Sequence, residues 1–169
     1  MSDEYFMNMA LEEARISANR GDLPVGSVLT IDGGLIGRAG NSATSKDDWT
    51  SHAEYLVLNQ FSSVIKRRKS GDNVLYTTWE PCLMCMGCSV LSRVSEIVYA
   101  CPDPSGGVAS VDPLHLGEWY VKKWPKIRQG PFREESFNLL EKVMLENLDR
   151  WGSFLERFRR GMDAENREE

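Results

Sequence analysis

Two short segments hold most of the side chains in this chain that could bind a metal or transfer a proton. His52 and Glu54 lie two residues apart, and Cys82 and Cys85 follow with C-x-x-C spacing. Two thiolates at that spacing can reach one ion from a single turn, and imidazole is the other frequent zinc ligand. Three protein ligands leave a fourth position for water, which is the pattern of a catalytic rather than a structural zinc site. Glu54 is then the natural base for the proton of that water.

A closed structural zinc site is the alternative interpretation, and it needs a fourth protein ligand. The remaining cysteine and histidine residues of the chain are Cys88, Cys101 and His115. Cys88 is the strongest of these because it lies on the same predicted helix as Cys85, although cysteine is also a common buried residue in helices. We expect Cys101 to be structural and His115 to be an ordinary polar residue. Such a zinc-stabilised interaction module would leave Glu54 without a role.

The two segments carry a family resemblance. His52-Ala53-Glu54 followed by Pro81-Cys82-Leu83-Met84-Cys85 resembles the H-x-E…P-C-x-x-C signature of zinc-dependent cytidine and nucleobase deaminases. The similarity extends to residues 23–29, 40–41 and 75–78, and it is close to bacterial tRNA adenosine deaminases, guanine deaminases and fungal cytosine deaminase. Beyond about Ser110 the chain departs from these family patterns.

The resemblance implies a role for each site residue. It implies that Zn²⁺ is bound by His52, Cys82 and Cys85. Glu54 would serve as both base and acid, and Asn41 would hydrogen-bond the substrate, although a turn asparagine is its ordinary alternative. The amide beside Ala53 and the carbonyl near Trp79 are implied partners of the base edge. The Trp79 ring could stack on a flat substrate or fill the core.

Two substrates fit this chemistry. The first is a free nucleobase or nucleoside, whose amino group is replaced by an oxo group with release of ammonia. The alternative is tRNA, with adenosine converted to inosine at the anticodon wobble position; residues 7–29 and 92–94 favour it by resemblance. The chain has 25 acidic and 20 basic residues, whereas binding several phosphates needs clustered cations, so we expect the small substrate. The basic run at residues 66–69 is explained by its place at a helix end.

Hydrophobic periodicity predicts alternating helices and strands. The expected helices are residues 4–19, a segment from His52 capped by Thr50 or Ser51, 81–91 and 132–160, with a possible break at Gly152. The expected strands are 24–31 and 35–39 as a hairpin, 73–77, 96–100 and a weak one at 125–128, while 102–118 is an irregular loop and 163–169 a frayed tail. This order and the resemblance imply a single α/β domain over residues 1–169, a three-layer α/β/α fold with a central mixed five-stranded sheet.

The sequence also predicts where the protein is located and how it assembles. The chain has no apolar run long enough to cross a membrane and an acidic N-terminal segment, so we expect a cytoplasmic protein without membrane association. The resemblance implies a homodimer, to which Met84, Met86 and Val90 could contribute unless they pack in the core. Five aromatic residues of the last third could close over a flat ring, namely Trp119, Tyr120, Trp124, Trp151 and Phe154.

Overall fold

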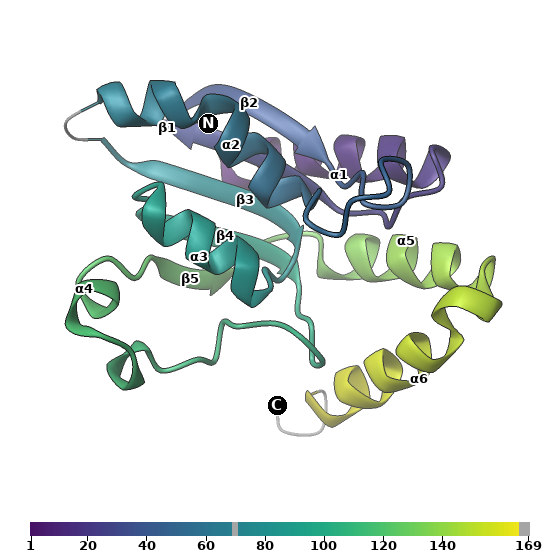
Figure 1. Cartoon of the computed structure of the whole chain (residues 1–169). Coiled ribbons are helices and arrows are strands. Elements are labelled where there is room, and N and C mark those ends of the chain that lie inside the picture. Colours follow the sequence, from purple (N-terminus) through teal and green to yellow (C-terminus); the bar gives the residue numbers. More distant parts are fainter. Residues whose placement is uncertain (69–70, 166–169) are drawn as a thin grey trace.

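The structure is a computed structural model that describes residues 1–68 and 71–165, and its centre is a mixed five-stranded sheet of order β2-β1-β3-β4-β5 (Figure 1). The strands are β1 (Gly26–Ile31), β2 (Gly34–Gly40), β3 (Asn73–Trp79), β4 (Glu96–Cys101) and β5 (Lys126–Gln129). β1 is antiparallel to β2 and β3, whereas β3, β4 and β5 run parallel. The predicted mixed sheet is confirmed, including the weak strand expected at residues 125–128.

The β1–β2 hairpin follows from its turn residues. Asp32 and Gly33 both have positive φ, at 53° and 74°, and Ile31 pairs with Gly34. Positive φ at both central residues defines a type I′ turn, whose twist matches that of the flanking strands and for which Asp-Gly is a preferred pair. The turn therefore fixes the register of the first two strands.

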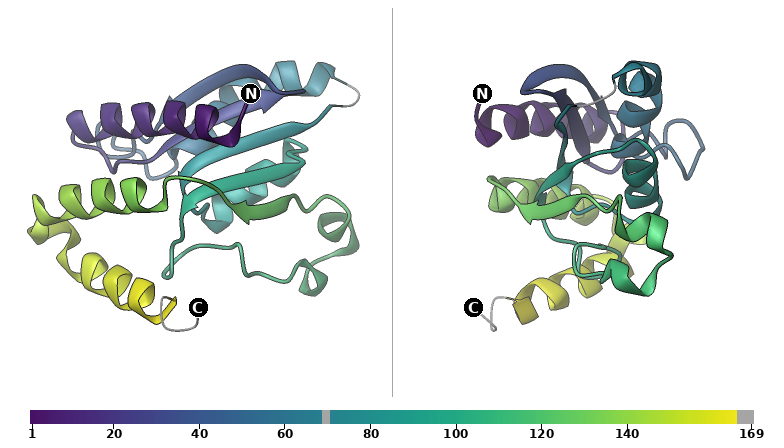
Figure 2. Two further views of the ribbon diagram at one scale, coloured as in Figure 1. Left: turned by 180° about the vertical axis from the view of Figure 1, so that it is seen from behind. Right: turned by 90° about the vertical axis from the view of Figure 1, so that its left-hand side faces the viewer.

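Helices cover both faces of the sheet. They are α1 (Asp3–Asn19), α2 (Ala53–Arg67), α3 (Leu83–Leu91), α4 (Glu118–Val121), α5 (Arg133–Leu145) and α6 (Leu148–Glu165), with a 3-10 turn at Pro113–His115. α1 and α5 lie on one face and α2 and α3 on the other, as the views from behind and from the side show (Figure 2). The three-layer arrangement is the one predicted.

Side-chain alternation along the strands divides the core between the two faces. Leu75 packs with side chains of α2 and α3, while the next residue, Tyr76, packs on Phe6 of α1 with ring centroids 5.1 Å apart. β1 and β4 repeat the pattern with Leu29 and Ile97 on the first face and Val28 and Val98 on the second. Successive strand residues point to opposite faces, so these three strands are buried on both sides and the sheet edge carrying the site is held rigidly.

The C-terminal segment differs from the single helix predicted over residues 132–160. It forms two helices that reverse direction at Glu146 and Asn147, where the Asn147 side chain donates to the carbonyl of Val143 and the Asn147 carbonyl accepts from Arg150. Gly152 lies inside α6 and does not break it. The reversal lets α6 return towards the end of β3 instead of running away from the domain (Figure 1).

Smaller differences concern the segment ends. The basic run ends α2 at Arg67, with Arg68 as its C-cap, and Lys69 lies outside the described residues. α6 continues to Glu165, three residues into the segment predicted to be frayed, and residues 166–169 lie outside the described part. The loop expected at 102–118 contains the 3-10 turn. Within the described residues, no helix combines the length and apolarity needed to cross a membrane.

Candidate active site

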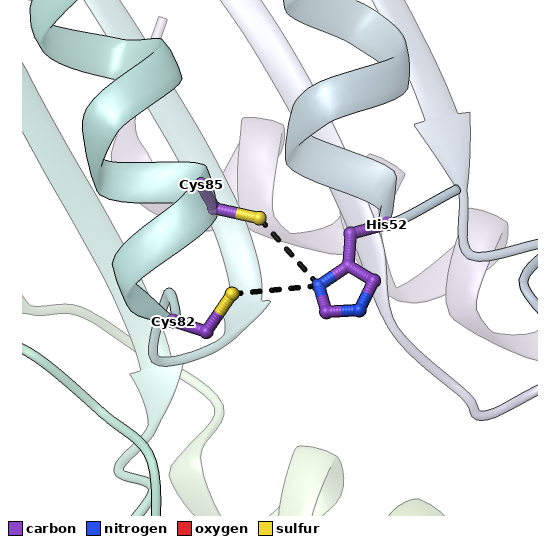
Figure 3. A group of neighbouring side chains, drawn as sticks. All are labelled: His52, Cys82 and Cys85. Carbon is purple, nitrogen blue, oxygen red and sulfur yellow. Dashed lines mark hydrogen bonds between the residues drawn. The ribbon is translucent and has the colours of Figure 1, made fainter. Parts of the chain in front are cut away.

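The site forms where the N-termini of α2 and α3 meet beside the end of β3 (Figure 3). His52 and Cys82 are the N-cap residues of these helices, both with extended backbone and without a side-chain capping bond. The side chains that would ordinarily cap a helix are thus free to face one another. The free amides and dipole of each helix N-terminus also favour thiolate at this point.

Two predicted helix starts are therefore wrong by one or two residues. The hydroxyls of Thr50 and Ser51 bind the carboxylate of Asp48 at 2.7 Å each and do not cap α2. α3 starts at Leu83 and not at Pro81, because the proline precedes the N-cap. The prediction that both ligand sets meet at helix N-termini is confirmed.

The three predicted ligand residues converge on one point. His52 Nδ1 lies 3.6 Å from the Sγ of Cys82 and 3.6 Å from the Sγ of Cys85, and the three atoms lie within 4.8 Å of one another. A zinc ion with ordinary Zn–N and Zn–S bonds in tetrahedral geometry sets its N and S ligands about 3.6 Å apart. The donor atoms and their spacing therefore fit Zn²⁺. Ligation through Nδ1 requires that the imidazole proton reside on Nε2.

A fourth Cys, His, Asp or Glu does not join this group among the residues that the structure describes. Cys88 packs against the core between the sheet and α2, and Cys101 is buried at the end of β4. His115 is exposed on the 3-10 turn, 3.9 Å from the carboxylate of Asp112. The arrangement is thus that of an open three-ligand site and not of a closed structural one.

The ligand side chains influence one another's protonation. The Cys85 thiol, followed by His52, lowers the pKa of Cys82 to about 4, although burial of Cys82 acts in the opposite direction. The neighbouring Cys82 and burial together raise the pKa of Cys85, so one proton is retained between the two sulfurs. Metal binding displaces such protons, which makes zinc affinity dependent on pH.

Glu54 lies beside the ligand group without belonging to it. Its side chain is buried, with Oε1 accepting a hydrogen bond from Thr77 Oγ1 at 2.8 Å and Oε2 lying 3.5 Å from Cys85 Sγ. Burial raises the pKa of Glu54, while its backbone hydrogen bond, His52 and Thr77 oppose the shift. A carboxylate with a raised pKa is suited to take up and release a proton near neutral pH. Thr77, which orients it, received no role from the sequence.

A cavity of about 80 Å³ adjoins the ligand group. It is lined by Leu23, Val25, Asn41, His52, Glu54, Trp79, Glu80, Cys82 and Asp103. Asn41 is buried, and its Oδ1 accepts from the amide of Ala43 at 3.0 Å, so Nδ2 is its donor end. Ala53 lies in the core beneath, packed in one cluster with Val25 and Trp79, and is not among the lining residues.

Trp79 fills the core, as one of its two predicted alternatives expects, and its ring also lines the cavity. The ring lines the cavity and is 8% exposed, while Phe154 and Phe158 of α6 meet it edge-on with centroids 5.7 and 5.8 Å away. A Cβ on Gly161 of α6 would overlap Pro104, so the helix also contacts the loop after β4 closely. α6 therefore supports two walls of the cavity.

The five aromatic residues predicted to close over a ring do not line the cavity. Trp151 and Phe154 pack behind Trp79, and Trp124 packs on the core beside α2 and α3. Trp119 and Tyr120 are exposed on α4, where their rings form an edge-on pair. These aromatic residues were predicted to contact a flat substrate, but three of them, Trp124, Trp151 and Phe154, pack against the core instead.

Glu80 is a site residue that the sequence reasoning missed. Its carboxylate accepts the backbone N–H of Asp103 at 2.8 Å and of Ala109 at 2.7 Å, which folds residues 103–109 over the end of β4. A Cβ on Gly107 would overlap this carboxylate. Asp103 is thereby held at the cavity, and burial raises its pKa. The one available signal was the position of Glu80 directly before the Pro81-Cys82 pair.

An α/β/α fold with a three-ligand zinc geometry at two helix N-termini and a buried carboxylate beside it defines a class of hydrolytic metal site. Residues 1–101 match the family described as the cytidine and deoxycytidylate deaminase zinc-binding region. The chain belongs to this deaminase family, as the signature around His52 and Cys82 predicted.

Individual relatives indicate which deaminases this chain is similar to. The tRNA-specific adenosine deaminase of Bacillus subtilis is 33% identical over 144 residues, which cover 85% of this chain and 89% of the relative. A solved structure of a tRNA:A34 deaminase superposes with a TM-score of 0.71 at 33% identity, covering 81% of this chain and 99% of the other. The guanine deaminase of Bacillus subtilis gives a TM-score of 0.54 at 33% identity over 60% of this chain and 66% of its own.

Proposed function

We propose that this protein is a zinc-dependent hydrolytic deaminase that converts adenosine to inosine in the anticodon of tRNA. The observation that carries the chemistry is the buried Glu54 carboxylate beside, but outside, the three-ligand group. The similarity to tRNA-specific adenosine deaminases, which extends through most of the C-terminal third, supports tRNA as the substrate. It favours this alternative over the small-molecule substrate that net charge led us to expect.

The chain's own residues supply binding, orientation and proton transfer. Zinc bound by His52, Cys82 and Cys85 would supply Lewis-acid activation of water near neutral pH. Glu54, oriented by Thr77, takes one proton from the attacking water and gives it to the ring nitrogen, then takes the remaining hydroxyl proton and gives it to the leaving amine. Asn41 offers Nδ2 to an acceptor on the substrate, and Trp79 forms an apolar wall against the flat base. Ammonia leaves, and the ring carbon retains an oxo group.

The overall negative charge does not exclude a polyanionic substrate, because charges separated by more than about a Debye length are largely screened at physiological salt. Arg157 and Arg160 are exposed on α6, the helix whose Phe154 and Phe158 pack on Trp79. We propose that these two arginines bind phosphates flanking the target base.

A free nucleobase, such as the purine handled by the guanine deaminase relative, is the second candidate. The observation that favours it is the similarity to the guanine deaminase structure at 33% identity. A base flipped out of an anticodon loop also presents only its ring to the cavity, so the cavity does not separate the two substrates.

Substrate comparison is the decisive experiment. Zinc-loaded protein is incubated with an anticodon stem-loop carrying wobble adenosine, with the same stem-loop carrying guanosine there, and with free guanine, cytosine, adenosine and cytidine. We expect inosine only in the first RNA, detected by mass spectrometry, with affinity falling as salt rises. Ammonia from free guanine with an unreacted stem-loop would instead establish the second candidate.

Glu54→Gln is the matched inactive variant. The amide keeps the size of the side chain and can still accept from Thr77, but it cannot carry the proton. We expect about one zinc per chain by elemental analysis, as in the native protein, and turnover reduced by about 10²-fold or more. Retained turnover would remove Glu54 from the mechanism.

We also propose a homodimer, with α3 at the interface. Leu83 and Leu91 are 68% and 69% exposed on this helix, whereas Met86 and Val90 are buried in the core, which answers the alternative left open for them. We propose that a partner subunit covers these two leucines, which would remove their apolar surface from water. Light scattering over a range of protein concentrations tests this, and a monomeric mass throughout would contradict it.

A further inference from the structure

A buried carboxylate organises the segment between α1 and β1. The Asp22 side chain is 0% exposed and accepts three hydrogen bonds: from Arg20 Nε at 2.7 Å, from the Ser45 amide at 2.8 Å and from Ser45 Oγ at 2.8 Å. Two of the three donors belong to the loop between β2 and α2. Asp22 therefore ties this loop to the end of α1 from more than twenty residues away.

The same arginine reaches Asn41. While its Nε binds Asp22, Arg20 Nη2 donates to the Asn41 carbonyl at 2.6 Å. Asn41 is fixed at two further points. Its backbone N–H donates to Val25 O at 2.8 Å, and its side-chain Oδ1 accepts from the backbone N–H of Ala43 at 3.0 Å. The planar guanidinium can hold two acceptors at once in a fixed geometry, which an ammonium cannot.

The loop anchored in this way joins Asn41 to the metal ligand His52. The Ser42 amide donates to the carbonyl of Ser51 at 3.0 Å, which closes the loop at its base. A displacement of the backbone at Asn41 would therefore also change the direction in which the Asn41 side-chain amide faces His52 and the two cysteines.

We propose that Arg20 and Asp22 are positioning residues that hold Asn41 so that Nδ2 points at the substrate. Asn41 lines the cavity, whereas Arg20 and Asp22 do not. Asp22 is fully buried and Arg20 is 41% exposed, and the best-attested use of an ion pair with a buried partner is to fix one conformation rather than to add net stability. The inference rests on the proposed function, because Asn41 acts on a substrate only if the site is a deaminase.

A double-mutant cycle tests the coupling. Arg20→Gln and Asp22→Asn should lower kcat/KM on the accepted substrate by about tenfold, with zinc content unchanged. In an Asn41→Ala background the same substitutions should cost less than about twofold, because the group they position is gone. Equal losses in both backgrounds would show a merely structural role and overturn the proposal.

Arg38→Gln is the matched control. Arg38 is 41% exposed, as is Arg20, and it pairs with Glu12 and Glu13 of α1 without touching Asn41. We expect it to leave kcat/KM unchanged in both backgrounds. A loss equal to that of Arg20→Gln would mean that any arginine pair on α1 has this effect, which also overturns the proposal.

Amide hydrogen exchange gives a readout that needs no activity. In Arg20→Gln and Asp22→Asn the amides of Ser42 and Ser45 should exchange faster, while those of α3 keep their protection. If the native protein deaminates none of the substrates, the proposed function fails, and exchange still decides the anchoring: unchanged protection at Ser42 and Ser45 refutes it, and local acceleration supports it.

Discussion

Phe158→Ala measures how firmly α6 supports the site. The Phe158 ring is fully buried, stacked on Phe137 at 5.5 Å and on Phe154 at 6.1 Å, and meets Trp79 edge-on at 5.8 Å. Truncating a buried phenylalanine to alanine costs about 3–5 kcal/mol from lost burial and the cavity left behind. For a chain of this length that corresponds to a melting temperature lower by roughly 6–20 °C.

The assay is thermal and urea unfolding followed by circular dichroism at one fixed zinc concentration, since bound metal itself shifts apparent stability. Glu156→Ala, an exposed position on the same helix, is the control and should change stability by less than about 0.5 kcal/mol. Where both proteins are folded, Phe158→Ala should also lower kcat/KM, because Trp79 loses a neighbour that fixes its ring. A loss of stability below about 1 kcal/mol would refute the packing of α6 against the cavity wall.

Two further substitutions test other parts of the molecule. Gly107→Ala should lower both stability and activity because its Cβ would overlap the Glu80 carboxylate, whereas Gly87→Ala in α3, with no atom within 4 Å of the added carbon, should stabilise the protein by about 0.5–1 kcal/mol. Urea midpoints that rank Gly107→Ala at or above the native protein would contradict this. Burial alone raises the pKa of Asp22, but the Ser45 amide, Arg20 and the Ser45 hydroxyl outweigh it and hold the pKa below its ordinary 3.8. The stabilisation is therefore present above about pH 4 and lost as the pH falls through the lower folded value, so Asp22→Asn should lower stability at pH 7 and flatten its decline below about pH 4. Parallel acid limbs for the two proteins would show that Asp22 is not the titrating group.

Features that depend on residue type and short spacing could be predicted before the structure was known. Cys82 and Cys85 reach one point because only two residues separate them at a helix start, and Glu54 lies near His52 for a similar reason. The Asp32-Gly33 turn fixed the first hairpin because few other residue pairs adopt positive φ twice in succession. The mixed sheet followed from periodicity together with the family resemblance.

The residues that contact the site from distant parts of the sequence became evident only in the folded structure. Thr77 orients Glu54 across 23 residues, Arg20 reaches the Asn41 carbonyl across 21, and Glu80 binds the amide of Ala109 across 29. No local sequence pattern marks these partners, because a threonine, an arginine or a glutamate is equally compatible with a solvent-exposed position. Only the folded structure shows which groups they contact.

The arrangement of the C-terminal helices also could not be predicted from the sequence, because it depends on packing against the rest of the fold. Hydrophobic periodicity continues from α5 into α6, so the sequence predicted one helix. The reversal at Asn147 is favoured because it buries Leu155, Phe158 and Met162 against Trp79 and its neighbours, a contact made with β3 rather than within the segment. The direction of a helix is set by the surface available to cover its apolar face, and that surface exists only once the sheet has formed.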